Sequence, residues 1–314
     1  MKTSVTVPID NENKKCLKES QQDNQSIKIL FLDLTNFSKS QQFIFCGLGI
    51  FICYIPYGYL QEIMFKLDGF KYHGWYLTLY QFFLNAIFAF TERSCKTTNQ
   101  NRAPSSLLFI LASLTVGTIG LSNSSIGYLN YPTQVIFKCC KLIPVMIGGI
   151  LIQGKKYEII DFIATFSLSC GLVLFMLADK IVSPNFNITG IVLISGALVA
   201  DAIIGNLQEK IMKTYGTCNL DLIFYSYGIG FFYILFGCLV SGEFFSAATF
   251  FAEYPLLTYG YGFLFSLSGY IGIQVVLTMV LACGALSTVT LTTCRKAITI
   301  VLSFLLIQKP FIMQ

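Results

Sequence analysis

The chain has 314 residues, of which 54% are hydrophobic and only 12% are charged, and its formal net charge is +5 at pH 7. A soluble domain carries about 25% charged residues. This composition therefore excludes an ordinary soluble globular protein and favours a membrane protein.

The N-terminal segment differs from the rest of the chain in composition. It is rich in Lys, Asn, Gln and Ser and contains no apolar core before a small-residue cleavage site. We therefore expect residues 1–40 to form a disordered, polar cytosolic tail rather than a signal peptide.

Apolar stretches of the length that crosses a bilayer, about 20 residues, follow one another from residue 41 onward. The sequence predicts nine of them, at 41–65, 74–91, 106–122, 131–152, 158–178, 187–208, 221–240, 257–281 and 285–308. With a cytosolic N-terminus, the cytosolic loops hold seven Lys or Arg residues and the opposite loops hold four. This bias agrees with the positive-inside rule.

Two cationic clusters interrupt these apolar stretches, Lys138 with Lys141 and Arg295 with Lys296. A charge at the centre of a bilayer costs about 2.5–3.5 kcal/mol on insertion scales, so such charges need water, a counter-charge or an anionic ligand. We interpret the clusters as the binding site for a polyanionic substrate. For Lys138 the alternative is that its ammonium reaches the headgroups.

Four polar residues of the fourth stretch follow at helical spacing: Tyr131, Gln134, Lys138 and Lys141. Steps of three and four residues place them on one face of a helix. Pro144 cannot donate to the helical ladder and is expected to kink this span, either for function or for packing alone.

The ninth stretch brings hydroxyl groups to its cations, because several threonines precede Arg295 and Lys296. Adjacent residues point about 100° apart on a helix, so we expect Lys296 to face the cavity and Arg295 to meet an acid. The candidate counter-ions are Glu62, Asp201 and Glu209, although Glu209 is better interpreted as an interfacial charge beside Lys210. The role of Asp201 stays open between structural hydrogen bonding and transport.

Aromatic side chains that could stack on a nucleobase occur on nearly every span, and any one of them is more often core than ligand. The candidates are Tyr225, Tyr227, Tyr259, Tyr261 and Tyr270. The sequence contains no Walker motif, no dinucleotide-binding glycine pattern and no metal-ligand spacing. We therefore expect neither an enzyme nor a cofactor or metal.

An internal repeat is visible in two short echoes. Leu60-Gln61-Glu62 recurs as Leu207-Gln208-Glu209, and Leu151-Ile152-Gln153 recurs as Leu306-Ile307-Gln308. Five spans per unit would invert the second unit, as in many secondary transporters. The sequence thus predicts a first five-helix repeat at 41–178 and a second at 187–314. A tenth helix would be missing, which suggests a truncated chain.

Several motifs together resemble the nucleotide-sugar transporter family over residues 41 to 311. They are Tyr57-Gly58-Tyr59-Leu60-Gln61-Glu62, the stretch from Leu121 to Val135, Lys138-Cys139-Cys140-Lys141 and Thr292-Thr293-Cys294-Arg295-Lys296-Ala297. The resemblance implies an all-α polytopic membrane protein with the drug/metabolite transporter-like inverted repeat. It also implies residence in the Golgi membrane.

The same resemblance implies a substrate and a site. Within the family, the likeness is greatest to members that import 3′-phosphoadenosine 5′-phosphosulfate (PAPS) into the Golgi lumen for sulfation, in exchange for an adenosine nucleotide. It implies phosphate contacts by Lys138, Lys141 and Lys296, with Glu62 at an acidic gate position. The complete expected substrate site is Asn130, Tyr131, Gln134, Lys138, Lys141, Arg295 and Lys296.

Other functions remain open at the level of the sequence. Exchange of ATP for ADP, or of a UDP-sugar, is the nearest alternative. A truncated membrane interaction partner without transport activity is an alternative of a different class, and a membrane-embedded transferase fits poorly because no nucleophile and base are visible. We expect the partners to be the nucleotide and the bilayer, not a nucleic-acid polymer, and a homo-oligomer is compatible with the sequence.

Overall fold

The protein is a predominantly helical bundle in the computed structural model. The structure describes residues 28–29, 32–33, 35–65, 67, 69–95, 103–126, 128–129, 137–138, 140–178 and 187–306. The longer helices are α2 (Lys39–Phe65), α3 (Gly74–Cys95), α4 (Ser105–Ile126), α6 (Leu142–Gln153), α7 (Ile159–Ala178), α8 (Ile188–Tyr215), α9 (Asn219–Ser241), α10 (Glu243–Glu253), α11 (Tyr261–Cys283) and α12 (Ala285–Leu306).

Short elements complete this description. A 3-10 helix covers Phe70–His73, and a π-helical turn covers Leu256–Gly260 just before α11. Two antiparallel strands, β1 (Lys28–Ile29) and β2 (Leu32–Asp33), pair within the range that composition assigns to the polar tail. β1 lies against α11.

Each of the nine apolar stretches contains a helix in the described part of the chain. Within the described residues, five helical segments are by length and composition able to cross a membrane: Lys39–Leu60, Ser105–Ser122, Ile188–Tyr215, Asn219–Ser241 and Leu256–Cys283. Large apolar side chains such as Ile159 and Phe236 are 77% and 71% exposed. Such exposure is unfavourable in water and suits contact with lipid tails.

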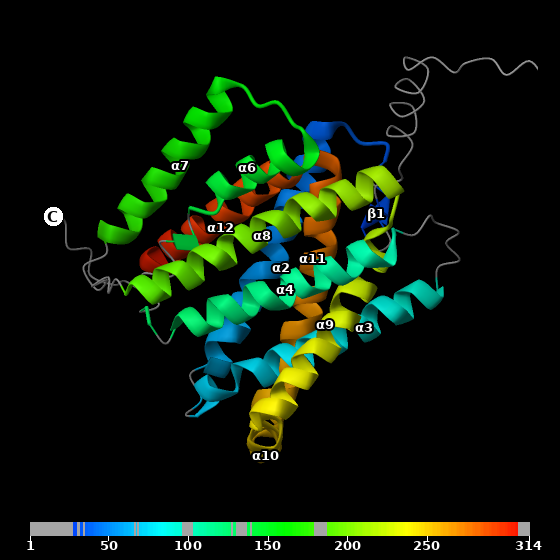
Figure 1. The fold of residues 1–314 in the computed structure, drawn as a ribbon, viewed down its shortest axis with the longest axis vertical. Coiled ribbons are helices and arrows are strands. Elements are labelled where there is room, and N and C mark those ends of the chain that lie inside the picture. The colour runs from blue at the N-terminus through cyan, green and yellow to red at the C-terminus, as the bar shows by residue number, and fades with distance from the viewer. Residues whose placement is uncertain are drawn as a thin grey trace, which may run out of the picture.

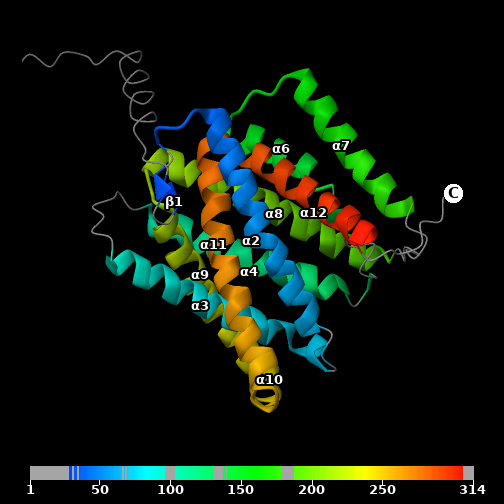
Figure 2. The same ribbon diagram turned by 180° about the vertical axis from the view of Figure 1, so that it is seen from behind.

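The helices pair in a pattern that brings the two halves of the chain together. α2 packs along α11, α4 packs on α8, and α3 packs on α9 (Figures 1 and 2). Fully buried side chains of α4, α8 and α9, including Leu111, Ile211 and Leu222, form the largest apolar core. α7 packs on α6 at the edge of the bundle.

Capping residues fix both ends of α8, the helix that carries Asp201 and Glu209. The side chain of Asn187 accepts a hydrogen bond from the N–H of Thr189 at 2.9 Å, which caps the first turn. At the other end Gly216 adopts a left-handed conformation with φ 64°, which glycine tolerates without steric cost. The helix therefore continues beyond the end at 208 that hydropathy predicts.

The fourth stretch departs from the prediction of one helix from 131 to 152. Among its described residues, Lys138 has helical conformation, Cys140 and Lys141 form a turn, and α6 begins at Leu142. Pro144 explains the break, because its ring would clash with the carbonyl of residue 140 if the helix ran through, whereas the first turn of a new helix tolerates it. The span is thus interrupted near the expected place, and in the described residues the interruption takes the form of a turn before α6.

A second departure is α10, which hydropathy does not predict. Its 11 residues are too few to cross a bilayer. The helix follows α9 directly after Gly242, whose φ is 75°. Phe251 is fully buried and stacks on Phe70 with ring centroids 5.6 Å apart, so α10 caps one end of the bundle.

A buried carboxylate holds together the end of the bundle where α6 and α8 finish and α12 begins. Glu209 is fully buried, and its Oε1 accepts from Lys155 Nζ at 2.6 Å and from Lys213 Nζ at 2.8 Å. Its Oε2 accepts from the N–H of Ala285 at 2.7 Å and from Gln153 Nε2 at 3.1 Å. The interpretation of Glu209 as an interfacial charge is wrong.

The neighbours of this carboxylate agree with its burial. Lys210 is exposed and donates to the carbonyl of Ile152 at 3.1 Å, so it does not pair with Glu209. Burial, together with the nearby carboxylates of Glu209 and Asp161, raises the pKa of Tyr157 in the α6–α7 connection. The phenol therefore stays neutral beside Glu209. One acid thus ties α8, the α6–α7 connection and the start of α12 into one unit.

We expect Glu209→Gln to lower the stability of the protein. The amide keeps the shape of the side chain but loses both charge-assisted bonds to lysine, which costs about 1–3 kcal/mol. Thermal unfolding in detergent should show a lower midpoint, whereas Glu243→Gln, at an exposed position on α10, should leave it unchanged. Equal midpoints for both variants would contradict a stabilising role for the cluster.

Candidate functional site: a cationic cavity beside an aromatic one

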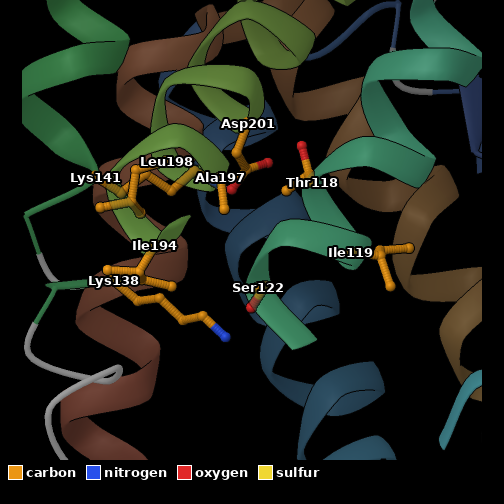
Figure 3. Close-up of a pocket in the computed structure, with 9 residues that line it drawn as sticks. All are labelled: Thr118, Ile119, Ser122, Lys138, Lys141, Ile194, Ala197, Leu198 and Asp201. Carbon is orange, nitrogen blue, oxygen red and sulfur yellow. The ribbon is translucent and has the colours of Figure 1, made fainter. Parts of the chain in front are cut away.

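A cavity of about 280 Å³ lies between α4, α8 and the segment that precedes α6 (Figure 3). Its described lining residues are Thr118, Ile119, Ser122, Lys138, Lys141, Ile194, Ala197, Leu198 and Asp201. We call it the cationic cavity, because two of its side chains are lysines and only one is an acid. Hydroxyl groups of α4 supply further hydrogen-bonding capacity.

Lys141 and Asp201 form an ion pair in the wall of this cavity. Lys141 Nζ lies 2.6 Å from Asp201 Oδ2, and the two side chains are 24% and 34% exposed. The pair joins the turn before α6 to the middle of α8. Because α6 also packs on α8, the pair spans an existing helix contact.

Lys138 enters the same cavity from one turn earlier in the chain. Figure 3 shows its side chain extending toward the space beside Ser122 of α4. Lys138 and Lys141 lie on either side of the break that precedes α6, and they nevertheless line one cavity. The predicted gathering of these two cations is therefore found. The shared helical face with Tyr131 and Gln134 lies outside the described residues and stays a prediction.

A second cavity, of about 210 Å³, has a different character. We call it the aromatic cavity; its described lining residues are Tyr54, Tyr57, Gln81, Phe82, Thr115, Ile119, Tyr227, Gly269 and Ile273. Tyr57 stacks on Phe265 with ring centroids 4.1 Å apart, which fixes its orientation. Gln81 Nε2 donates to the Tyr57 hydroxyl at 3.4 Å, so the cavity also contains an amide.

The two cavities adjoin at Ile119, which lines both of them. In Figure 3 the side chain of Ile119 points away from Lys138, Lys141 and Asp201. Each cavity alone is below the range of about 300–1,000 Å³ typical of small-molecule sites, whereas both together fall within it. A ligand that fills them needs one anionic end and one flat, apolar end.

Arg295 lies next to the aromatic cavity. Its guanidinium carbon is 5.0 Å from the centroid of the Tyr54 ring, within the range of a cation–π contact. The sequence predicts that Arg295 meets an acid; the structure places its guanidinium on the Tyr54 ring, and the pairing with an acid stays a prediction.

Other predicted site residues lie partly or wholly outside the described structure. Asn130, Tyr131 and Gln134 are outside the described residues. Glu62 and Lys296 fall on α2 and α12, but their side chains are not described. Predictions about these five residues therefore stay predictions.

The candidate tyrosines differ in their contacts. Tyr227 lines the aromatic cavity and lies 4.7 Å from Phe82, centroid to centroid. Tyr270 donates to Glu92 at 2.6 Å, and Tyr259 shares a hydrogen bond with Tyr76. Tyr54, Tyr57 and Gln81 also line this cavity. The sequence does not predict them as site residues, because isolated aromatic and amide residues in an apolar span have no distinguishing pattern.

The features above define a helical, multi-pass membrane protein with a polar site inside its helical bundle. Comparison with known families adds that residues 42–314 match the model of the UAA transporter family. The chain belongs to the UAA transporter family.

Curated relatives carry a more specific name. The chain is 55% identical to adenosine 3′-phospho 5′-phosphosulfate transporter 2 of Aedes aegypti, over 92% of this chain and 76% of that protein. It is 52% identical to the protein of the same name from Homo sapiens, over 99% of this chain and 77% of that protein. The Mus musculus protein of that name is also 52% identical, over 92% and 79%.

Glycines of α11 allow the tyrosines of the aromatic cavity to approach that helix closely. A Cβ at Gly272 would lie 2.8 Å from Tyr54 Cε2, and one at Gly269 would lie 3.0 Å from Tyr57 Cε2. Both contacts are shorter than or at the limit of what carbon atoms tolerate. The shape of the cavity therefore depends on these glycines.

We expect Gly272→Ala to destabilise the protein by about 1–3 kcal/mol, because the methyl group displaces Tyr54. The matched control is Gly237→Ala on α9, where a Cβ meets nothing within 4 Å; Ala should be neutral there or stabilise by up to about 1 kcal/mol. Thermal unfolding of both variants measures this. A Gly272→Ala variant as stable as the control would show that the tyrosine ring moves aside freely.

Proposed function

We propose that the protein is an antiporter of the Golgi membrane that imports PAPS from the cytosol into the lumen in exchange for an adenosine nucleotide. The names of its curated relatives support the substrate. The single observation that carries the proposal from the structure is the adjoining of a cationic and an aromatic cavity at Ile119. The protein itself performs no covalent chemistry in this proposal.

The anionic end of the substrate suits the cationic cavity. PAPS carries about four negative charges, since its 3′-phosphate monoester carries about −1.5 to −2 near neutral pH and its 5′-phosphosulfate adds about two more. Lys138 and Lys141 supply compact ammonium groups there. The broken span adds the N-terminus of α6 directly after Lys141, and the positive end of a helix favours anions.

Further phosphate contacts are proposed for Arg295 and for residues whose side chains the structure does not describe. Lys296 would bring a third ammonium from α12, and Arg295 would add a guanidinium beside Tyr54. Asn130, Tyr131 and Gln134 would line the substrate path before Lys138, and Glu62 would act as an acidic gate. Their proposed roles rest on the sequence motifs and the family resemblance.

The flat end of the substrate suits the aromatic cavity. A purine can stack on Tyr54, Tyr57 or Tyr227, an interaction that is worth about 1–3 kcal/mol per base in other nucleotide-binding proteins. The amide of Gln81 has both a donor and an acceptor, which matches the N6 and N7 edge of adenine. The length of the nucleotide would then run from the tyrosines to the lysines.

The helix pairings support an inverted repeat of two units, with nine spans in this chain. If α2, α3, α4 and α6 correspond to α8, α9, α11 and α12, then the contact of α2 with α11 exchanges with that of α8 with α4. Likewise α6 on α8 exchanges with α12 on α2, and the pairs α3–α9 and α6–α12 map onto themselves. A set of helix contacts that is unchanged when the two units are exchanged is expected of a pseudo-twofold axis.

The orientation with a cytosolic N-terminus follows from the loop charges. In that orientation the Glu209 cluster would lie at the cytosolic end of the bundle. Exchange of ATP for ADP or of a UDP-sugar is the competing transport function. A truncated membrane interaction partner without transport activity is the competing function of another class.

The proposal is tested by reconstituting the purified chain in liposomes loaded with an adenosine nucleotide. We expect labelled PAPS to enter loaded vesicles and not empty ones, because antiport requires a substrate on both sides. Uptake of ATP or of a UDP-sugar in preference to PAPS would replace the substrate. Absence of flux for every nucleotide would favour the non-transporting partner.

We expect Lys141→Gln to abolish this exchange while the protein stays folded, because the amide cannot balance phosphate charge. Lys141→Arg should also fail, since a planar guanidinium does not replace a compact ammonium in a shaped cavity. Lys296→Gln is expected to behave in the same way. The control is Lys156→Gln in the α6–α7 connection, outside both cavities. Exchange near the parental rate in Lys141→Gln would assign this lysine a structural role.

A further inference from the structure

Asp201 is chemically out of place in a site for a polyanion. It is the one acid among the described residues that line the cationic cavity, and its neighbours on α8 there, Ile194, Ala197 and Leu198, are apolar. A carboxylate within contact distance of bound phosphate would weaken binding by repulsion. The observation requires a reason for an acid at this position.

The ion pair with Lys141 supplies that reason. At 2.6 Å, the carboxylate occupies the position at the Lys141 ammonium that a substrate phosphate would need. In the absence of substrate, the pair compensates a charge that would otherwise be costly inside the membrane. The carboxylate and a phosphate cannot both hold the same face of the ammonium.

The exposure of the pair allows it to open. Both side chains are partly exposed to the cavity, at 24% and 34%. An exposed or partly exposed ion pair contributes only about 0–1 kcal/mol, so its opening is compatible with a reversible cycle. This contrasts with Glu209, which is 0% exposed and holds two lysines.

We propose that Asp201 is the resting counter-ion of Lys141, and that the substrate anion binds by displacing this carboxylate from the ammonium. The inference rests on the proposed function and adds a residue that tunes it. Once displaced, Asp201 remains in the cavity wall and repels the bound anion. It therefore lowers affinity for the substrate and speeds its release on either side of the membrane.

The test compares Asp201→Asn with the parent protein. Two probes are used in equilibrium binding to the purified chain, PAPS and inorganic tripolyphosphate. Removing the competing charge should tighten binding of both probes about two- to fivefold, the size expected for loss of a partly exposed ion pair. In liposomes the same variant should show a lower KM and a lower maximal exchange rate.

Matched variants separate this role from a structural one. Asp161→Asn removes the same charge at the start of α7, where the amide oxygen can still accept the N–H of Glu158, and should leave both affinities within about twofold of the parent. Asp201→Glu keeps the charge and should retain parental affinity. Lys141→Gln should lose binding, so the two partners of one ion pair would have opposite effects.

Each result decides the proposal. An affinity of Asp201→Asn for the probes that equals or falls below that of the parent contradicts it. Failure of both Asp201→Asn and Asp201→Ser to fold also contradicts it, since a pair that opens in every cycle cannot be required for folding. Tighter binding of tripolyphosphate without any binding of PAPS would support the counter-ion role and contradict the proposed substrate. Binding of neither probe by any variant would contradict both.

Discussion

The cost of placing charge inside a lipid-embedded bundle is the constraint on which this structure depends. Cations of the described bundle lie in several settings, and the form of compensation differs among them. Lys155 and Lys213 meet the fully buried Glu209, and Lys141 meets Asp201. Arg295 meets the π-face of Tyr54. The differences among these settings separate structural charge from charge that is available to a ligand.

The Glu209 cluster has the properties of a structural element. Four donors satisfy both carboxylate oxygens, including the backbone N–H of Ala285. A carboxylate with that many bonds has no capacity left for a ligand. The Lys141–Asp201 pair is a single contact at the edge of a cavity, next to a second lysine. Only the second arrangement leaves room for an anion, which is why the proposed substrate site lies there.

Much of the helical architecture could be predicted from the sequence because hydropathy alone marks segments that avoid water. Each predicted stretch contains a helix, and the two lysines of the fourth stretch do line one cavity. Pro144 predicts a disturbed helix in this stretch, but its sequence context does not reveal that a turn at Cys140 and Lys141 precedes a helix that begins at Leu142. The sequence does not predict α10, because an 11-residue amphipathic helix is too short to give the hydropathy signal of a membrane span.

The side-chain partners were harder to predict than the helices. Glu209 and Asp201 are both acids on α8, two turns apart, and their sequence surroundings do not reveal that one is fully buried and the other lines a cavity. That difference comes from contacts with the α6–α7 connection and α12, which are distant in sequence. The aromatic cavity combines residues of α2, α3, α4, α9 and α11. Only tertiary packing brings them together.

A structure of the protein in a lipid nanodisc with PAPS bound tests the central claim most directly. The account predicts phosphate oxygens within about 4 Å of the Lys141 ammonium, the Asp201 carboxylate turned away from it, and the adenine against the tyrosines of the aromatic cavity. An intact Lys141–Asp201 pair with the nucleotide bound elsewhere would contradict it.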